Sequence, residues 1–434
     1  MDSLVSQAEV QRQDLLLQRA QSKVDLPLRF WRQQAHFTTP ATGKPARAIQ
    51  GLAPVARLLA RHQIELVEIS ERTGVSLSVL QQLINDQPNS PLVMVDAEDA
   101  VADTAEAALA ARQGAVDCFN QAQWGQTLRF FRPAGLGLSS CIEDLTQVIE
   151  GAFDSTSHQL KLDGIIWPKV EDAAEMAWLC NLLSNIEARL GLTANTISVQ
   201  FLVESATAVE QIEAIIEVAL ARLSGIIWGA ADYAADVGLV HWQNDHPLFD
   251  HARMIIINAA GAAGVPAIDA MTFNYPTPLH RGDDLSGNDL SGDDLSGDQR
   301  QQNHDHILVA LEQVYNDAIH GRDLGMSGKW VGHPAQLLMV QAAYREQIGE
   351  QQLQIALDGL KSYQQSVALG LGATIIGQGA AAQMADRATD RHLRSQLRRA
   401  AANGLLLAQT ALQAGLINDL EYDQLCSLAG ETSD

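Results

Sequence analysis

The chain has 434 residues, of which 47% are hydrophobic and 19% are charged, and this length and composition suit one large α/β domain with an additional module. The 52 Asp and Glu residues outnumber the 29 Lys and Arg residues, so the formal net charge is -23. A surface this acidic repels the phosphates of nucleic acids and anionic membranes, and we expect neither as a partner.

The cysteines and the N-terminal segment indicate the cellular compartment. Cys118, Cys141, Cys180 and Cys426 are far apart and form no Cys-x-x-Cys pair, which predicts free thiols rather than a disulfide framework or a zinc site. The first residues lack the apolar core of a signal peptide, and no apolar run approaches the roughly 20 residues of a membrane helix. We therefore expect a cytoplasmic protein.

Short apolar runs alternate along the chain with longer helical patterns. Residues 1 to about 34 are typical of a polar-rich amphipathic helix. Eight apolar runs then follow, at residues 36–39, 92–95, 127–131, 164–168, 197–203, 225–229, 266–270 and 329–333. Runs without polar alternation are typical of parallel strands buried on both faces, and the segments between them repeat apolar residues every three or four positions. This pattern predicts an α/β fold, a (β/α)₈ TIM barrel over residues 35–345.

Two regions of the chain differ from the barrel pattern. Residues 281–302 repeat Asp-Leu-Ser-Gly and have too little apolar surface to pack, so we expect a flexible loop there, with weak calcium binding as an alternative. Residues 346–434 are rich in Ala, Leu and Gln and contain no predicted strand. We expect them to form a C-terminal helical extension that acts as a lid or in oligomerisation.

Ionisable residues stand where seven of the eight predicted strands end. They are Asp96, Glu98 and Asp99 after the second run, Arg129 and Arg132 in and after the third, Lys169 after the fourth, Glu204 after the fifth, Asp232 and Asp236 after the sixth, Asp269 in the seventh and His333 after the eighth. In TIM-barrel enzymes the active site lies at this end of the strands. We therefore predict an active site at this rim.

The carboxylates of Glu204 and Asp232 follow neighbouring strands. Two oxygen ligands with room for water and substrate suit Mg²⁺, and the absence of His and Cys from this part of the rim disfavours zinc. A magnesium ion beside an arginine polarises a keto or hydroxy acid and stabilises an enolate or alkoxide. A structural salt bridge is the alternative for either carboxylate taken alone.

Two other residues of the rim have structural alternatives. His333 precedes a proline, so it either contributes to the site or accepts a hydrogen bond that shapes a turn. Lys169, in "WPKVED", is either a Schiff-base or substrate-binding lysine or an ion-paired structural residue, because two acidic residues follow it closely.

Six motifs together resemble one enzyme family. They are "VDAEDAV", "LDGIIWPKVED", "FLVESATAV", "GIIWGAADYAADVG", "GVPAIDAMT" and "GMSGKWVGHPAQL". In this order they resemble the HpcH/HpaI aldolase and citrate lyase beta-subunit superfamily, and most of all its malyl-CoA and citramalyl-CoA lyases. The resemblance implies an Mg²⁺- or Mn²⁺-dependent carbon–carbon lyase that cleaves a 3-hydroxyacyl-CoA to a 2-oxo acid and an acyl-CoA, or runs in reverse. It also implies a homotrimer or homohexamer.

The resemblance further implies roles for individual residues of the rim. Glu204 and Asp232 would be the metal ligands, and Glu98 and Asp99 would hold metal-bound water and orient the site. Arg129 would bind the carboxylate and the oxygen of the 2-oxo acid.

The resemblance implies one more role, for Asp386. It does not decide which of the two arginines of the third predicted strand binds the substrate. Within "QMADRATD", Asp386 matches an aspartate that reaches into the neighbouring subunit's site and acts as acid or base on the enolate carbon. The stretch "LRFFRPAG" departs from the family pattern and resembles malate synthases, so Arg132 is the alternative substrate arginine.

Two other functions remain open at this point. One is an aldolase that cleaves free 4-hydroxy-2-oxo acids without CoA, and the longer C-terminal extension favours the thioester lyase over it. The other is a non-catalytic homologue, which the presence of both carboxylates and the arginine disfavours.

Overall fold

The computed structural model describes residues 2–241, 243–281, 295–346, 350–376 and 382–429. Its centre is a closed barrel of eight strands in the order β1-β10-β9-β8-β7-β6-β3-β2, with every neighbouring pair parallel. The strands are β1 (Ala35–Pro40), β2 (Leu92–Asp96), β3 (Leu128–Arg132), β6 (Gly164–Trp167), β7 (Ser198–Val203), β8 (Leu223–Trp228), β9 (Ala267–Asp269) and β10 (Gly328–Val331). Each predicted apolar run forms one of these strands, so the TIM-barrel prediction is confirmed.

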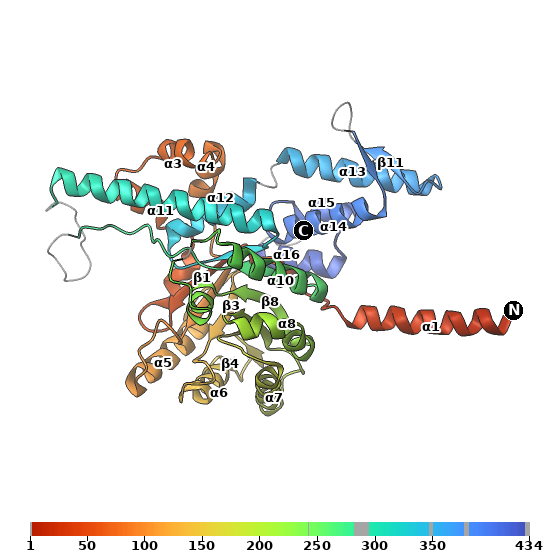
Figure 1. The fold of residues 1–434 in the computed structure, drawn as a ribbon, viewed down its shortest axis with the longest axis horizontal. Helices are drawn as coiled ribbons and strands as arrows, with labels where there is room; N and C mark the ends of the chain where they lie inside the picture. Colours follow the sequence, from red (N-terminus) through yellow and green to blue (C-terminus); the bar gives the residue numbers. More distant parts are fainter. Residues whose placement is uncertain (1, 242, 282–294, 347–349, 377–381, 430–434) are drawn as a thin grey trace.

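Helices surround the barrel and bury their apolar faces against it (Figure 1). They are α5 (Ala105–Gln121), α6 (Cys141–Gly151), α7 (Ala173–Leu190), α8 (Ala206–Ala219), α9 (Ala230–Asp236), α10 (Pro247–Ala263), α11 (Gly297–Leu324) and α12 (Pro334–Glu346). Between β1 and β2 the chain adds η2 (Pro45–Gln50), α2 (Val55–Arg61), α3 (Leu66–Thr73) and α4 (Leu77–Asp86), and a small hairpin, β4 (Phe153–Asp154) and β5 (Gln159–Leu160), precedes β6.

The two faces of each strand meet different surroundings. Side chains that point into the barrel form a separate core with Met94, Phe130, Leu202 and Ile227 among its members. The residues between them, such as Phe131, join the larger core under the helices. Because successive side chains of a strand alternate between faces, the position of any rim residue follows from its register relative to these two cores.

A short 3-10 helix, η1 (Leu28–Trp31), lies across the N-terminal end of the barrel. Phe30 packs edge-on against Phe130 inside the barrel, with ring centroids 6.4 Å apart. The Gln33 side chain donates a hydrogen bond of 2.9 Å to the carbonyl of Ser224, near the start of β8. These contacts fill the end of the barrel opposite the predicted active site.

The C-terminal extension forms a unit with its own core, and that core includes Leu28 of η1. Its elements are α13 (Glu350–Ala368), β11 (Thr374–Ile376), β12 (Gln383–Ala385), α14 (Arg387–Ala402), α15 (Ala408–Gln413) and α16 (Asp419–Ala429). The Arg399 guanidinium lies 4.4 Å from the ring centroid of Trp31, so the unit is attached at the N-terminal end of the barrel. The extension is mainly helical as predicted, but the expectation that it lacks strands is wrong, because β11 and β12 pair antiparallel.

The N-terminal segment is helical over α1 (Asp2–Gln21), and this helix projects away from the rest of the molecule (Figure 1). The side chains of residues 7–21 are exposed on every face, so the expected amphipathic helix is shorter than predicted and buries no apolar face. No helix in the described part of the chain is long and apolar enough to cross a membrane.

The repeat segment is described only in part. Residues 282–294, which carry most of the predicted loop, lie outside the described residues. Gly297 already begins α11, and Ser296 and Gln299 form a capping box at its start. The expectation of a loop as far as Gln302 is therefore wrong from Gly297 onward, because the cap satisfies the first free N–H groups of a helix.

Candidate active site

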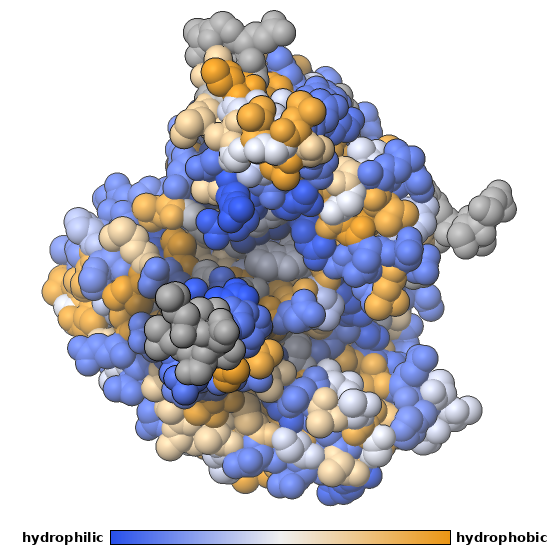
Figure 2. Space-filling view, turned by 90° about the vertical axis from the view of Figure 1, so that its right-hand side faces the viewer, coloured by the Kyte–Doolittle hydropathy of each residue, from blue (hydrophilic) through white to orange (hydrophobic). Residues whose placement is uncertain are grey.

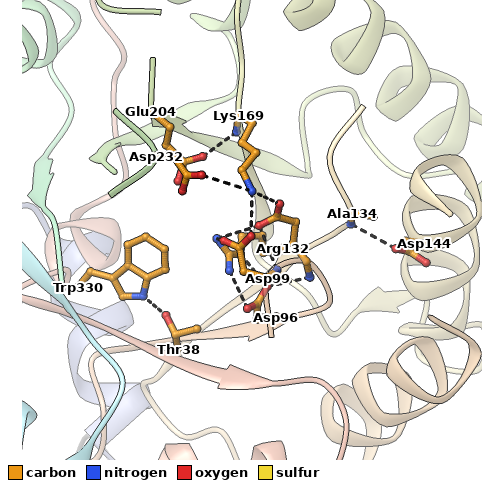
Figure 3. A network of polar contacts seen from close by, with 11 residues as sticks. Thr38, Asp96, Asp99, Arg132, Ala134, Asp144, Lys169, Glu204, Asp232 and Trp330 are labelled. Atoms are coloured by element: carbon orange, nitrogen blue, oxygen red, sulfur yellow. Dashed lines mark hydrogen bonds and ion pairs between the residues drawn. The ribbon is translucent and has the colours of Figure 1, made fainter. Parts of the chain in front are cut away.

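Asp96 and Arg132, the last residues of β2 and β3, form an ion pair at the rim (Figure 3). The two residues are partners in the register of β2 and β3. Arg132 donates from Nε to Asp96 Oδ1 at 2.6 Å and from Nη2 to Oδ2 at 2.7 Å, and both side chains are buried. Burial would lower the pKa of Arg132, but the charge and hydrogen bonds of Asp96 raise it, so the arginine stays charged. A two-bond pair of this kind holds the guanidinium in one orientation.

The carboxylates of Glu98 and Asp99 lie between Arg132 and Lys169. Arg132 Nη1 is 3.3 Å from both Glu98 Oε2 and Asp99 Oδ2, yet this buried nitrogen makes no hydrogen bond to any described residue. The ammonium of Lys169 is 2.5 Å from Glu98 Oε1 and 2.8 Å from Asp99 Oδ1. The acidic residues after β2 thus face cations from two other strands, which explains why they follow a buried strand.

Lys169 also contacts the carboxylates on the far side of the rim. Its backbone N–H donates to Glu204 Oε2 at 2.9 Å, and its Nζ lies 3.9 Å from Asp232 Oδ1. Lys169 has a φ of 50°, which is uncommon for a residue other than glycine. Figure 3 shows its side chain extending from the Glu204 side of the rim toward Arg132.

Glu204 follows β7 directly and is 4% exposed, whereas Asp232 lies in the first turn of α9 and is half-exposed. A Cβ atom on Gly229 would lie 2.2 Å from Glu204 Cγ. Gly229 has an ordinary φ of -113°, so the close approach of Glu204 is what requires a glycine here.

Burial disfavours the charged form of two rim carboxylates, Glu204 and Glu98. It raises the pKa of Glu204 to about 8, and the charge of Arg132 offsets part of this effect while the charge of Asp232 adds to it. Burial likewise raises the pKa of Glu98 to about 7, although Arg132 opposes the shift. Burial disfavours the ionised form of these carboxylates, and a cation bound beside them would stabilise that form.

The rim residues fit a metal that takes few protein ligands. Within the part of the chain that the structure describes, no three His, Cys, Asp or Glu side chains are arranged to hold a metal ion together. The protein side of a site would therefore be the pair Glu204 and Asp232. Mg²⁺ typically uses one or two carboxylates and keeps several waters, so the pair fits this ion better than it fits zinc or calcium.

Arg129 is not at the rim, contrary to the expected position. It belongs to the face of β3 that points away from the barrel interior and lies near the start of the strand. Its Nε and Nη2 bind Asp163 at 3.0 Å and 2.9 Å, and Arg29 binds the same carboxylate. The three-residue spacing from Arg129 to Arg132 places the two arginines on opposite faces of the strand.

Asp269 and Asp236, which were also predicted to lie at the rim, form hydrogen bonds outside the site. The carboxylate of Asp269 accepts from Arg253 Nε at 2.7 Å and from Lys329 Nζ at 3.1 Å, on the helix-facing side of the barrel. Asp236 accepts a hydrogen bond of 2.8 Å from the backbone N–H of Ala206. Neither residue is part of the cluster around Arg132.

His333 and Asp386 shape the backbone next to them. The backbone N–H of Ala335 donates to His333 Nδ1 at 3.2 Å, which confirms the alternative that His333 shapes a turn. Asp386 caps α14, and its Oδ1 accepts from the backbone N–H groups of Ala388 and Thr389. These bonds lower the pKa of this exposed carboxylate.

Trp330 lies next to Arg132 at the site, a position that no motif in the sequence predicted. Its indole N–H donates to the Thr38 hydroxyl, and Arg132 Cζ lies 5.2 Å from its ring centroid. Trp330 is in β10 and shares the barrel interior with Phe130. The only feature of the sequence that could have placed Trp330 near the site is its position in the last apolar run, one residue after Lys329.

Parts of this chain are similar in sequence to known lyases. Residues 80–278 match the family described as HpcH/HpaI aldolase/citrate lyase. An L-malyl-CoA/beta-methylmalyl-CoA lyase of Cereibacter sphaeroides is 26% identical over 303 residues, which are 65% of this chain and 80% of that protein. A citrate lyase subunit beta of Leuconostoc mesenteroides subsp. cremoris is 29% identical over 184 residues, or 42% of this chain and 56% of that protein.

One solved structure supports the fold over nearly the whole chain. A citrate lyase from Burkholderia xenovorans LB400 is 18% identical and superimposes with a TM-score of 0.56, covering 91% of this chain and 98% of that chain. The protein CitE of Mycobacterium tuberculosis, solved with magnesium and acetate, covers 74% of this chain and 96% of that chain with 18% identity and a TM-score of 0.44. The predicted resemblance to malyl-CoA lyases and citrate lyase beta subunits is confirmed, and the family match includes the rim carboxylates but not Asp386.

Proposed function

We propose that this chain, which matches the family described as HpcH/HpaI aldolase/citrate lyase over residues 80–278, is an Mg²⁺- or Mn²⁺-dependent carbon–carbon lyase. It cleaves a 3-hydroxyacyl-CoA, such as malyl-CoA or citramalyl-CoA, to a 2-oxo acid and an acyl-CoA. The observation that carries the proposal is the formal charge of the rim. Five carboxylates face two cations there, namely Asp96, Glu98, Asp99, Glu204 and Asp232 against Arg132 and Lys169.

The formal excess of three carboxylates over cations is what a divalent cation would offset, whereas an anionic substrate would bind to that cation and to Arg132. Glu204 and Asp232 would hold the metal, which when bound supplies Lewis-acid polarisation of the substrate's keto oxygen. Gly229 supports this role, because its missing side chain leaves the space that Glu204 occupies.

Arg132 takes the role that the family resemblance implied for Arg129. Its Nη1 is buried 3.3 Å from Glu98 and Asp99 and makes no hydrogen bond to a described residue, so it would donate to the carboxylate or keto oxygen of a 2-oxo acid that displaces these contacts. Asp96 orients the guanidinium through two hydrogen bonds. A donor fixed in this way stabilises negative charge on the reacting oxygen without reorganising during the reaction.

The reaction also needs a group that exchanges a proton with the enolate carbon. In cleavage, the C3 hydroxyl gives its proton to a base and becomes the carbonyl of the 2-oxo acid, the bond between C2 and C3 of the thioester breaks, its electrons form the enolate of the acyl-CoA, and an acid protonates C2. We assign this step to Asp386 of a neighbouring subunit. In the condensation direction, the same carboxylate would remove the proton as a base.

The position of the C-terminal unit supports a role for Asp386 in another subunit. The unit packs on η1 at the N-terminal end of the barrel, and in Figure 1 it lies on the side opposite the start of α11. Ile375 and Met384 are opposite each other on β11 and β12, and they are 70% and 71% exposed. Hydrophobic atoms gather at the top of Figure 2, in the region of this unit, as expected of a surface that contacts a second copy.

Substrate assays test the proposed reaction directly. Purified protein with Mg²⁺ is offered malyl-CoA, citramalyl-CoA and free 4-hydroxy-2-oxo acids, and the released 2-oxo acid is measured. We expect cleavage of a CoA ester, and we expect loss of that activity in EDTA and in Glu204→Ala and Asp232→Ala, with the fold retained. Near-normal turnover of both variants in EDTA would contradict the metal site.

Mixed oligomers test the assignment of Asp386. Asp386→Ala and Glu204→Ala should each be inactive alone, and should recover part of the activity when their subunits are mixed, because some sites then receive an intact metal centre and an intact acid. If the mixture remains inactive although subunit exchange is demonstrated, Asp386 is a helix cap only.

One observation favours the aldolase alternative. A cavity of about 630 Å³ opens beside the rim, and its lining includes Asp245, Asp317 and His320 but no Lys or Arg among the described residues. The phosphates of CoA bind best to cationic side chains, so CoA must bind elsewhere if it is used. Cleavage of only the free hydroxy-oxo acids in the assay above would establish the aldolase instead.

A further inference from the structure

Lys169 is the one residue that the described contacts connect to both halves of the rim. Its ammonium is 2.5 Å from Glu98 and 2.8 Å from Asp99, on the Arg132 side. The same nitrogen is 3.9 Å from Asp232, and the backbone N–H binds Glu204, on the proposed metal side.

The backbone of Lys169 is adapted to this double contact. A φ of 50° is unfavourable for a residue with a side chain, and strain of this kind persists only where the surrounding structure holds it. Here the N–H group is directed to Glu204 while the side chain crosses the rim to Glu98. The hydrogen bond to Glu204 occupies Oε2, so one oxygen of this proposed ligand is already in use.

The charge of Lys169 has opposite effects on the two halves. Beside Glu98 and Asp99 it offsets negative charge and keeps two like-charged carboxylates together. Beside Asp232 it repels any cation that the same carboxylate binds. At a separation of about 4–5 Å this repulsion is large enough to change a binding constant by about tenfold even when water screens it.

We propose that Lys169 is a positioning residue that serves as a built-in counter-cation, holding Glu98 and Asp99 in place and lowering the affinity of the rim for divalent ions. This inference rests on the proposed function, because it requires a metal at Glu204 and Asp232. With Lys169 present, the metal-free rim is assembled and the ion binds reversibly. Without it, the carboxylates lose a partner and a divalent ion takes over part of its role.

The test measures Mn²⁺ binding to the full chain by electron paramagnetic resonance and calorimetry at one pH. Lys169→Met keeps most of the length of the side chain and removes the charge, and we expect it to bind Mn²⁺ about tenfold more tightly than wild type. Lys169→Arg keeps the charge and should stay within about threefold of wild type. Lys361→Met removes the same charge from an exposed position in α13 and should not change the affinity.

A melting experiment covers the case in which Lys169→Met folds poorly. The metal-free variant should melt at a lower temperature than wild type, and saturating Mn²⁺ should raise its melting temperature by more than it raises that of wild type. Unchanged or weaker Mn²⁺ binding by folded Lys169→Met would overturn the inference while leaving the proposed function intact. Failure of wild type to bind Mn²⁺, or equal binding by Asp232→Ala, would overturn both.

Discussion

The two ends of the barrel differ in how their charges are balanced. At the N-terminal end, Arg29 and Arg129 share Asp163, and Phe30 packs inside. Burial would raise the pKa of Asp163, but its bonds to Arg129 and the charge of Arg29 hold that pKa below its ordinary value. At the C-terminal end, carboxylates outnumber cations, and burial raises the pKa of Glu204 to about 8. A buried ionisable residue therefore indicates a site only where its charge is left uncompensated.

Arg129 and Arg132 show this difference within a single strand. Both are arginines of β3 and donate from Nε and Nη2 to one carboxylate, but the Nη1 of Arg132 is buried 3.3 Å from two further carboxylates and makes no hydrogen bond to a described residue. Their separation by three residues is odd, so they point to opposite faces of the strand.

The largest expected effect is that of Arg132→Lys on activity. Lysine cannot reproduce the two bonds to Asp96 together with a free donor, so we expect turnover to fall by about 10²–10³. Arg129→Lys, the matched change at the other end, should retain turnover and lower the free energy of unfolding by about 1 kcal/mol. Steady-state assays and denaturant unfolding of both variants check this, and the reverse pattern would restore Arg129 as the substrate arginine.

A smaller effect is expected from Gly229→Ala. The added Cβ would lie 2.2 Å from Glu204 Cγ, so the carboxylate must move and Mn²⁺ binding should weaken by about tenfold or more. Gly261→Ala is the control, because its Cβ meets no atom within 4 Å and alanine favours the helix there by about 1 kcal/mol. Equal Mn²⁺ affinities for the two variants would show that the close approach at Gly229 is not needed.

Ionisation of Glu204 should make the metal-free protein less stable as pH rises. The pKa of Glu204 is about 8 in the folded state, against an ordinary value of 4.5, so its contribution is fully present below pH 4.5 and is lost as pH rises toward 8. Glu204→Gln removes this dependence, and added Mg²⁺ should stabilise wild type most near pH 8. Melting temperatures measured across this range test the sign, and a wild-type curve parallel to that of Glu204→Gln would reject it.

The N-terminal end should show the opposite dependence, with a smaller effect near neutral pH. His36 is buried, and burial lowers its pKa from 6.5 to about 3. A depressed histidine pKa means that stability is present above pH 6.5 and is lost as pH falls toward 3, by about 1 kcal/mol between pH 6 and pH 5. His36→Gln should remove this loss in acid unfolding. The sign is wrong if wild type and variant lose stability equally over that interval.

The sequence predicted the strands well because their residues are apolar on both faces, a pattern that few other structures share. It did not predict β11 and β12, whose three-residue strands expose Ile375 and Met384 instead of burying them. In the structure β11 contacts α13 and β12 contacts α14, and the two helices contact each other.

The rim was predictable in position but not in detail. The ends of the apolar runs located Glu98, Glu204, Asp232 and Lys169 at strand ends. A barrel brings those ends together at one rim. The choice between Arg129 and Arg132 required the register of β3, because the apolar run around them continues through Phe130 and Phe131 without alternation. The hydrogen bond from the Lys169 backbone N–H to Glu204 accompanies a positive φ, which the sequence does not predict for a lysine.

Binding of a 2-oxo acid is the sharpest test of the proposed site, because Arg132 and the carboxylate pair Glu204 and Asp232 would bind it together. The measurement is calorimetric titration of glyoxylate into wild type with and without Mn²⁺, and into Arg132→Lys and Arg129→Lys with Mn²⁺. We predict binding to wild type only when Mn²⁺ is present, retained binding by Arg129→Lys and lost binding by Arg132→Lys. Equal binding without Mn²⁺, or undiminished binding by Arg132→Lys, would contradict this prediction.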